Sequence, residues 1–479
     1  MIQASDYIGV LPEIVLAVFG IAVMMTEAAL PPGASRRPLG WLAFVGTLAA
    51  IAATLYQAQH PGTAFFDMVR VDSFSVFFHL LISFVAALVI LSSLEYLDTQ
   101  HIRAGEYYGL ILFGAVGMVL MSSAIELVLI FIALEISSIS TYVLAGFRRR
   151  APASIESSIK YFLLGSFATA FFLYGVALMF GATGTTRIYQ IADAVQSGQH
   201  SALVFTAVAL MFVGLGFKVG AAPFHVWTPD VYEGAPAPVV GLMSTAPKAA
   251  AFAVLLRVFF AASTPGWFWP VWISAALSMT LGNISALVQD NVKRLLAYSS
   301  IAHAGYLLVA FAAAREIGIS AAMFYTASYA LMNVGAFAVV SHFASAGERY
   351  VTLEDYAGLG RRSPGLAATL TIFLLSLIGI PITGGFFAKL YVFSAALQSN
   401  LVWLVIIAVI NSAIAAYYYL RIIVVMYMRE AREDAPPVAR VSAPLGVALA
   451  LSAAATIYLG VLPGRVLDYA SRGAALLTR

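Results

Sequence analysis

The chain of 479 residues contains no cysteine, and only 10% of its residues are charged. The absence of cysteine excludes disulfides, thiolate metal sites, iron–sulfur clusters and cysteine nucleophiles. The low charge, together with 61% hydrophobic residues, excludes a water-soluble globular protein. A formal net charge of +3 is too small to indicate nucleic acid as a partner. Zinc-protease, phosphate-loop and serine-hydrolase patterns are also missing, so nothing indicates bond-making catalysis.

Long apolar runs are what the sequence has in excess. At roughly 20 residues per crossing, the chain has room for about 14 transmembrane helices, and the expected fold class is an all-α polytopic membrane protein. The first run lacks a basic N-terminal region and a clear cleavage site, which favours a retained helix over a signal peptide. The predicted spans are 8–30, 39–58, 73–95, 106–123, 125–145, 155–180, 203–231, 236–262, 269–288, 295–314, 318–344, 365–398, 401–427 and 441–463.

Two spans, 203–231 and 365–398, are too long and too interrupted to be single straight helices. Such breaks are tolerated in a membrane only where protein or water satisfies the freed backbone groups, and paired breaks are typical of inverted-repeat transporters. A simple packing kink is the alternative for each. The interruptions are Gly214, Gly216, Gly220 and Pro223 around Lys218, and Gly379, Pro381, Gly384 and Gly385 before Lys389.

The basic residues in the loops predict the orientation. Loops after odd-numbered spans contain 14 Lys and Arg residues, Lys293 among them, whereas the opposite side contains 6. The richer side is expected to face the cytoplasm. With an even number of spans, both termini are then expected outside.

The cations within the spans are mostly lysine, whereas those in the loops are nearly all arginine. A desolvated lysine can release its proton and an arginine cannot, so this division favours proton transfer. Arg257 and Arg421 lie toward helix ends and are interpreted as structural anchors. The cations within the spans are Lys160, Lys218, Lys248, Arg257, Lys389 and Arg421.

Glu135, Lys218 and Lys248 lie near the midpoints of their predicted spans and therefore share one level. A charge at the bilayer centre costs at least about 2.5 kcal/mol. One mid-depth glutamate cannot neutralise Lys160, Lys218 and Lys248 together, which predicts that some lysines are neutral part of the time, as a proton relay requires. A static ion pair that fixes helix register is the alternative.

Three further residues leave two interpretations open. Lys160 lies about five residues into its helix and either snorkels to the surface or belongs to the relay. His303 lies mid-membrane and is either a proton carrier that links the lysines or a hydrogen-bonded core residue. His225 lies near the cytoplasmic face, where a structural and an entry role are equally compatible with the sequence.

Two segments resemble a known family. Residues 223–236, PFHVWTPDVYEGAP, followed by STAPK at 244–248, are similar to the signature of antiporter-like proton-translocating subunits of respiratory complex I and of Mrp-type sodium/proton antiporters. Residues 11–13 and 352–364 are most similar to the subunit N branch of bacterial complex I. The subunit M branch usually has a glutamate in place of Lys389, and the subunit L branch is extended by a long C-terminal helix.

The resemblance implies two inverted five-helix repeats, spans 4–8 and 9–13, with broken helices 7 and 12. The implied segments are a three-helix segment 1–105, repeats 106–262 and 263–428, and a C-terminal helix 429–479. The family's functional positions match Glu135, Lys218, Lys248 and Lys389, and Lys160 resembles a helix 6 lysine of this branch.

The break in helix 12 departs from the family pattern. The family usually has Gly-x-Pro-Pro there, and Ile382 replaces the second proline. Lys389 follows Pro381 by eight positions, so helical rise would place it roughly 12 Å beyond the break. Gly384 and Gly385 are expected to open a hydrated cavity beside it.

The resemblance further implies a proton-translocating subunit of NADH:quinone oxidoreductase in the bacterial plasma (inner) membrane. The chain itself would hold no cofactor, whereas partner subunits would hold NADH, FMN, iron–sulfur clusters and quinone. The implied partners are other membrane subunits, including neighbouring antiporter-like subunits, and lipid. Protons would pass from Glu135 and Lys218 by Lys248 and His303 to Lys389. An Mrp-type cation/proton antiporter subunit and a structural membrane scaffold are the alternatives.

Overall fold

The computed structural model describes residues 3–31, 33–102, 104–196, 201–262, 267–313, 316–344, 346–431, 435 and 438–477. Within them the chain is predominantly helical, as predicted. Its helices are α1 (Ala4–Gly9), α2 (Leu11–Ala29), α3 (Arg37–Gln57), α4 (Ser73–Thr99), α5 (Glu106–Ser123), α6 (Leu127–Ala145), α7 (Pro152–Thr183), α8 (Ile188–Gln196), α9 (Ser201–Val219), α10 (Thr228–Gly234), α11 (Ala237–Met243), α12 (Ala246–Ala262), α13 (Phe268–Leu287), α14 (Val292–Ala312), α15 (Glu316–Phe343), η1 (Ala346–Glu348), η2 (Leu353–Tyr356), α16 (Leu359–Arg362), α17 (Pro364–Ile378), α18 (Gly384–Gln398), α19 (Val402–Met428), α20 (Ala443–Val461) and α21 (Gly464–Ala475). Two short strands, β1 (Gly62–Ala64) and β2 (Val69–Val71), form an antiparallel hairpin that was not predicted.

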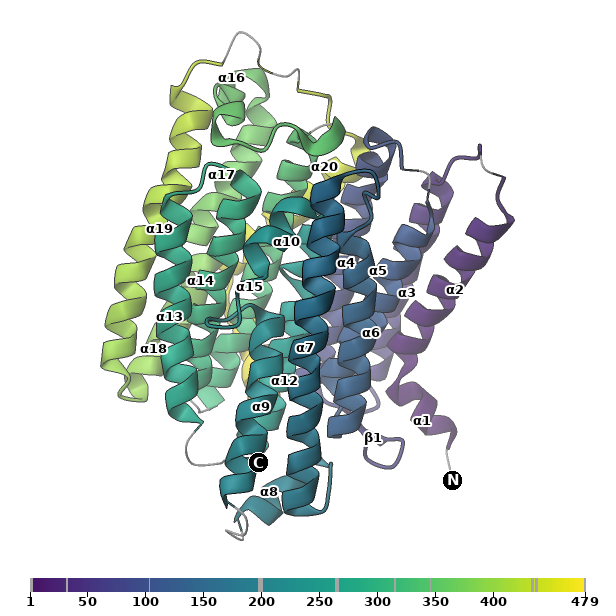
Figure 1. Cartoon of the computed structure of the whole chain (residues 1–479), viewed down its shortest axis with the longest axis vertical. Coiled ribbons are helices and arrows are strands. Elements are labelled where there is room, and N and C mark those ends of the chain that lie inside the picture. Colours follow the sequence, from purple (N-terminus) through teal and green to yellow (C-terminus); the bar gives the residue numbers. More distant parts are fainter. Residues whose placement is uncertain are drawn as a thin grey trace.

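The described residues contain 13 spans long and apolar enough to cross a membrane, and α17 with α18 supplies one further, broken crossing. This agrees with the predicted number. The helices run side by side, with α1, β1 and both chain ends at one end of the bundle and α16 at the other (Figure 1). Helix α21 was not predicted, and it packs against α15 and α4.

Both predicted helix interruptions are present. Helix α9 ends just before Gly220, whose φ is +71°, and α17 ends just before Gly379, whose φ is +92°. Glycine adopts this left-handed conformation without the steric cost of a Cβ atom. Ile382 also has a positive φ, +77°, which a proline ring fixed near −65° cannot adopt. The break between α17 and α18 therefore differs in geometry from a Gly-x-Pro-Pro break.

The predicted span over 236–262 is present as one crossing, Ala237–Phe259, but it is not a continuous helix. The structure divides this span into α11 and α12 at Ser244–Thr245. Pro247 explains the interruption, because it has no N–H to donate and its ring excludes the carbonyl of Met243 from a regular helical position. As a result, Lys248 lies in the first turn of α12.

An internal repeat is visible in the packing of the helices. The pair α5 and α6 and the pair α13 and α14 have corresponding features, all offset by the same number of residues. Because each repeat contains five crossings, an odd number, the second begins on the opposite face and is inverted. The corresponding features are Gly117 and Gly282 at close helix contacts, Glu126 and Asn291 as N-caps, and the isolated bridges of those caps with Arg187 and Thr352.

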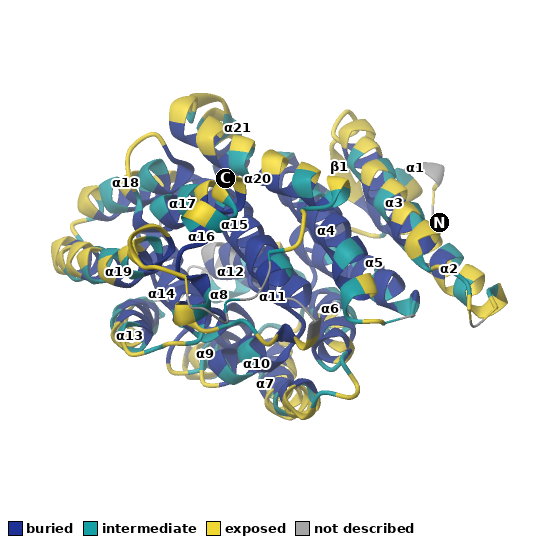
Figure 2. Cartoon of the chain, turned by 90° about the horizontal axis from the view of Figure 1, so that it is seen from above, coloured by how far each residue is buried: buried dark blue, intermediate teal, exposed yellow. Residues whose placement is uncertain are grey.

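The most buried helices lie at the centre of the bundle. Figure 2 shows α11, α12 and α15 in the middle with little exposed surface, whereas α2, α3 and α19 at the rim are widely exposed. The exposed side chains at the rim include Val18, Met25 and Trp403, as is typical of helices that face lipid. The central helices therefore provide the setting for any polar site.

Candidate functional site

Four of the predicted site residues lie inside the bundle with almost no exposure. The exposed fractions are 4% for Lys218, 3% for Lys248, 2% for His303 and 6% for Lys389. They come from α9, α12, α14 and α18 and thus from both repeats. Glu135 on α6 is half-buried and belongs to the same group, which we call the interior row.

Lys218 lies at the end of α9, directly before the break at Gly220. Its Nζ donates a hydrogen bond to Ser138 Oγ at 2.9 Å and lies 5.9 Å from the ring centre of Tyr161. Glu135 interacts with Lys218 electrostatically without a direct ion pair, and Glu135 Oε1 has no hydrogen-bond partner within the described residues. The two residues are therefore coupled through space and not locked together.

Lys248 lies beside the break that follows Lys218. A Cβ atom on Gly220 would lie 3.3 Å from Lys248 Nζ, so glycine at this position leaves room for the amine. Lys248 Nζ donates to the carbonyl oxygen and to the Oγ of Ser300 on α14. The first repeat thus reaches the second through Lys248.

His303 connects α14 with two tyrosines. Its Nδ1 lies 2.7 Å from Tyr325 Oη on α15, and its Nε2 lies 3.3 Å from Tyr419 Oη on α19. Both Lys248 and Lys389 interact with the imidazole electrostatically. His303 therefore interacts with both Lys248 on α12 and Lys389 on α18.

Lys389 bends back to the broken end of α17. Its Nζ donates to Leu377 O at 3.1 Å, to Ile378 O at 2.7 Å and to Ser412 Oγ at 2.8 Å. The rise of roughly 12 Å predicted for residue 389 along the helix therefore does not carry the amine away from the break, because the side chain satisfies carbonyls that the break leaves free.

The prediction that Gly384 and Gly385 open a cavity was wrong. A Cβ atom on Gly385 would lie 1.8 Å from Ser376 O, and one on Gly384 would lie 2.9 Å from Leu459 Cβ. These glycines therefore allow close packing of α18 on its neighbours and do not open a space.

Lys160 does not join the interior row. Its Nζ forms ion pairs of 2.7 Å with Asp230 and with Glu156, and its side chain is 40% exposed. These groups line a cleft of about 280 Å³ together with Glu233 and Arg294. Two carboxylates thus neutralise Lys160, so only the three interior lysines lack a direct carboxylate partner within the described residues.

Comparisons with known proteins identify the family to which the chain belongs. Residues 124–415 match the family model described as NADH:quinone oxidoreductase/Mrp antiporter, TM. NADH-quinone oxidoreductase subunit N 2 of Koribacter versatilis is 68% identical over 486 residues, which cover 100% of this chain and 99% of the relative. The chain belongs to the subunit N family of NADH-quinone oxidoreductases.

Solved structures agree with this family. A chain of respiratory complex I from Thermus thermophilus is 37% identical and superposes with a TM-score of 0.82, covering 95% of this chain and 98% of that chain. A chain of the Mrp complex from Dietzia sp. DQ12-45-1b has a TM-score of 0.88 at 20% identity and covers 99% and 98% respectively. The latter likeness shows a shared fold.

The internal repeat relates polar positions of this subunit N family member to one another. At the offset that relates the N-caps, Glu135 corresponds to Ser300, and Ser138 corresponds to His303. The second repeat thus has a hydroxyl where the first has a carboxylate. Sequence reasoning missed the roles of Ser138, Ser412, Tyr325 and Tyr419 as direct partners of the interior row, although Ser138 follows Glu135 by one helical turn.

A second group of buried charges joins the two repeats. Glu348 in η1 accepts hydrogen bonds from Tyr96 Oη and Ala237 N and forms ion pairs with Lys293 at 2.7 Å and Arg148 at 3.0 Å. Burial raises the pKa of Glu348, but the two cations outweigh it and hold the pKa below its ordinary value. The assignment of Lys293 to a loop was wrong, because its side chain is buried in the first turn of α14.

The two arginines have the anchoring partners that their positions predicted. Arg257 forms a buried ion pair with Asp72 at 2.8 Å, whereas Arg421 forms an exposed ion pair with Asp290, also at 2.8 Å. Burial raises the pKa of Asp72, but Arg257 outweighs this and the net pKa is lowered. These contacts tie α12 to the start of α4 and α19 to the end of α13.

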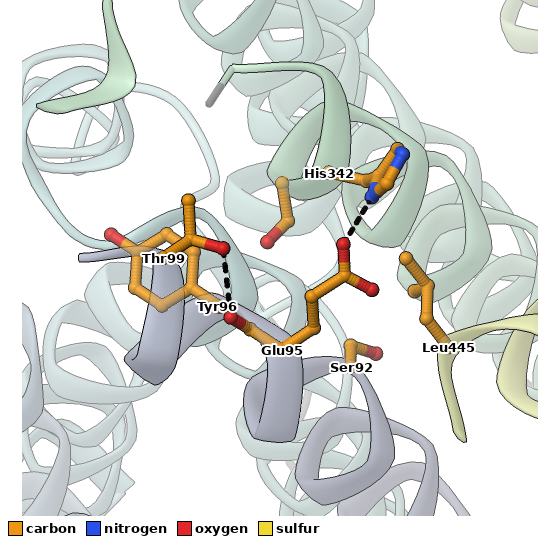
Figure 3. A pocket seen from close by; sticks show the side chains of 7 residues that line it. Ser92, Glu95, Tyr96, Thr99, His342 and Leu445 are labelled. Carbon is orange, nitrogen blue, oxygen red and sulfur yellow. Dashed lines mark hydrogen bonds and ion pairs between the residues drawn. The ribbon is translucent and has the colours of Figure 1, made fainter. Parts of the chain in front are cut away.

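A small pocket lies apart from these residues, between α4, α15 and α20. Figure 3 shows Glu95 and His342 at its centre, where Oε1 of Glu95 lies 2.7 Å from Nδ1 of His342. Its accessible volume of about 10 Å³ is the size of one water molecule. In the described part of the chain, no group of three or more His, Asp or Glu side chains is arranged to hold a metal ion.

Proposed function

We propose that this chain translocates protons across a bacterial plasma membrane as an antiporter-like subunit of proton-pumping NADH:quinone oxidoreductase. The observation that carries the proposal is the interior row, in which three buried lysines have no direct carboxylate partner among the residues that the structure describes. A charge in this position is costly, and a buried amine avoids the cost by releasing its proton. The names of the relatives support the assembly in which the chain works.

The proposed path begins at the cytoplasmic face, which we assign to the loops rich in arginine. Glu135 and Lys218 take up the proton, Lys248 and His303 pass it on, and Lys389 releases it outside, where both termini lie. The hydrogen bonds of His303 and the position of Lys248 beside Gly220 support this order. In the same proposal the open cleft of Lys160, with its two carboxylate partners, gathers protons near the cytoplasmic surface.

Energy for transfer comes from partner subunits. NADH, FMN, iron–sulfur clusters and quinone belong to them, and quinone reduction there alters the electric field on Glu135 and Lys218. The neighbouring partners include other antiporter-like membrane subunits, and lipid surrounds the exposed rim. We propose the segment boundaries 1–105, 106–262, 263–428 and 429–479 for the three-helix segment, the two repeats and the C-terminal part.

Transport of sodium is the competing function, because Mrp-type antiporters share the fold. A hard cation such as Na⁺ prefers several oxygen ligands in place of amines. The interior row presents three amines, one imidazole and one carboxylate, and this donor set favours protons. A purely structural scaffold would leave the buried amines as an unexplained cost.

The substitution Lys218→Arg tests the proposal in the assembled complex, reconstituted in vesicles with NADH and quinone. Arginine keeps the positive charge but does not release a proton, so proton output per electron should fall while the complex assembles. Lys293→Arg is the matched control, because Lys293 is equally buried but paired with Glu348. Normal pumping by the Lys218→Arg complex would refute the relay.

A further inference from the structure

The interior lysines share one kind of partner. Each donates a hydrogen bond to the hydroxyl of a serine on another helix. Lys160 and Lys293, in contrast, bond to carboxylates and to no serine within the described residues. The three pairs are Lys218 with Ser138 on α6, Lys248 with Ser300 on α14, and Lys389 with Ser412 on α19.

A serine hydroxyl suits a lysine that changes its protonation state. An ammonium group has three donors and no acceptor, whereas a neutral amine has two donors and a lone pair. An ionised carboxylate and a backbone carbonyl can only accept, so they satisfy the ammonium alone. A hydroxyl rotates, so it can accept from the ammonium and donate to the amine.

Lys389 illustrates why the hydroxyl matters. Two of its three hydrogen-bond partners are the carbonyls of Leu377 and Ile378, which have no proton to donate. Of these three partners, which are the ones found among the described residues, only Ser412 can supply a donor to the lone pair of a neutral Lys389. Without it, a buried polar group would be left without a partner, which is unfavourable in a membrane.

The same reasoning applies to the other two pairs. Lys218 has Ser138 as its hydrogen-bond partner, with Glu135 and the ring of Tyr161 nearby. Ser300, the partner of Lys248, occupies the position that Glu135 holds in the first repeat, so a group that both accepts and donates stands where a carboxylate would only accept.

We propose that Ser138, Ser300 and Ser412 are positioning residues that keep each interior lysine hydrogen-bonded in both of its protonation states. The proposal rests on the proposed relay. When a lysine passes its proton to the next acceptor, the serine O–H turns toward the lysine nitrogen, so the hydrogen bond reverses its direction and no covalent bond to the serine forms or breaks. The lysine then stays in place without a movement of the backbone.

Serine-to-alanine and serine-to-threonine variants of the assembled complex test this proposal. Each alanine variant should assemble normally, lower proton output about tenfold and move the pH optimum of pumping to lower pH, because the bond to the ammonium is the stronger of the two that are lost. Each threonine variant keeps a hydroxyl and should restore most of the output. Ser140→Ala is the matched control, because Ser140 lies on α6 and its hydroxyl bonds, among the described residues, to Ile136 O and not to a lysine.

The outcomes separate this inference from the proposed function. If Lys218→Arg stops pumping but Ser138→Ala, Ser300→Ala and Ser412→Ala leave output and pH profile unchanged, the inference is wrong and the relay stands. Threonine variants that fail as badly as alanine variants would also overturn it, since they would indicate packing instead of the hydroxyl. If Lys218→Arg pumps normally, the relay itself fails.

Discussion

Replacing Glu348 by glutamine removes the charge that holds the two repeats together. The carboxylate accepts from Tyr96 and Ala237 on one oxygen and from Lys293 and Arg148 on the other. Glutamine would leave two cations without a counter-charge and would turn an NH₂ group toward donors. Loss of one partner from a buried pair costs about 3–5 kcal/mol, which lowers the ratio of folded to unfolded subunit by roughly 10² to 10⁴.

The amount of assembled complex on native gels and its thermal inactivation measure this loss. Glu354→Gln is the matched control, because the pair of Glu354 with Arg429 is half exposed and such pairs contribute at most about 1 kcal/mol. The double variant Glu348→Gln/Lys293→Met should recover part of the loss, since it removes one of the stranded charges. Equal stability of the Glu348→Gln and Glu354→Gln complexes would refute the reasoning.

Three further outcomes are expected. Glu135→Gln should reduce turnover more than assembly, because Glu135 forms no direct ion pair with Lys218; parallel loss of both on native gels and in activity assays would favour a structural pair. Lys389→Gln, which keeps donors for the α17 carbonyls, should lower protons per electron with assembly intact, whereas Lys389→Ala should also lower the amount of complex. The pKa values of Glu348 and Asp72 are lowered in the folded state, so their stabilisation is present at neutral pH and should be lost progressively as the pH falls below the ordinary values, 4.5 for Glu348 and 3.8 for Asp72, which thermal inactivation at pH 7 and pH 3 would detect.

Much of the fold could be predicted because membrane helices are encoded in continuous apolar runs. The breaks at Gly220 and Gly379 were predictable, because glycines and prolines cluster there. The break before Lys248 was missed although Pro247 marks it, since a single proline inside an apolar run is common in membrane helices. The hairpin β1–β2 was also missed, because its strands have three residues each and no strong pattern.

The depth of a residue was easier to predict than its partners. The spacing predicted an interior position for Glu135, Lys218, Lys248 and His303, and the structure places the last three deep in the bundle and Glu135 half-buried. It could not predict that Lys160 meets two carboxylates, because Asp230 lies 70 residues away in the chain. Nor could it predict that Lys389 turns back to α17, because a side-chain direction depends on which carbonyls a broken helix leaves free.

The hydrogen bonds of His303 limit how a proton could pass through the centre of the bundle. A neutral imidazole carries one N–H, so the ring can donate to only one of Tyr325 and Tyr419 at a time. If a proton enters at Nε2 and another leaves from Nδ1, the ring is left in the opposite tautomer and both hydroxyls are reversed. The next proton cannot follow until the ring and the hydroxyls have turned back. In the proposed relay, transfer through this residue would therefore proceed one proton at a time, each followed by a reset.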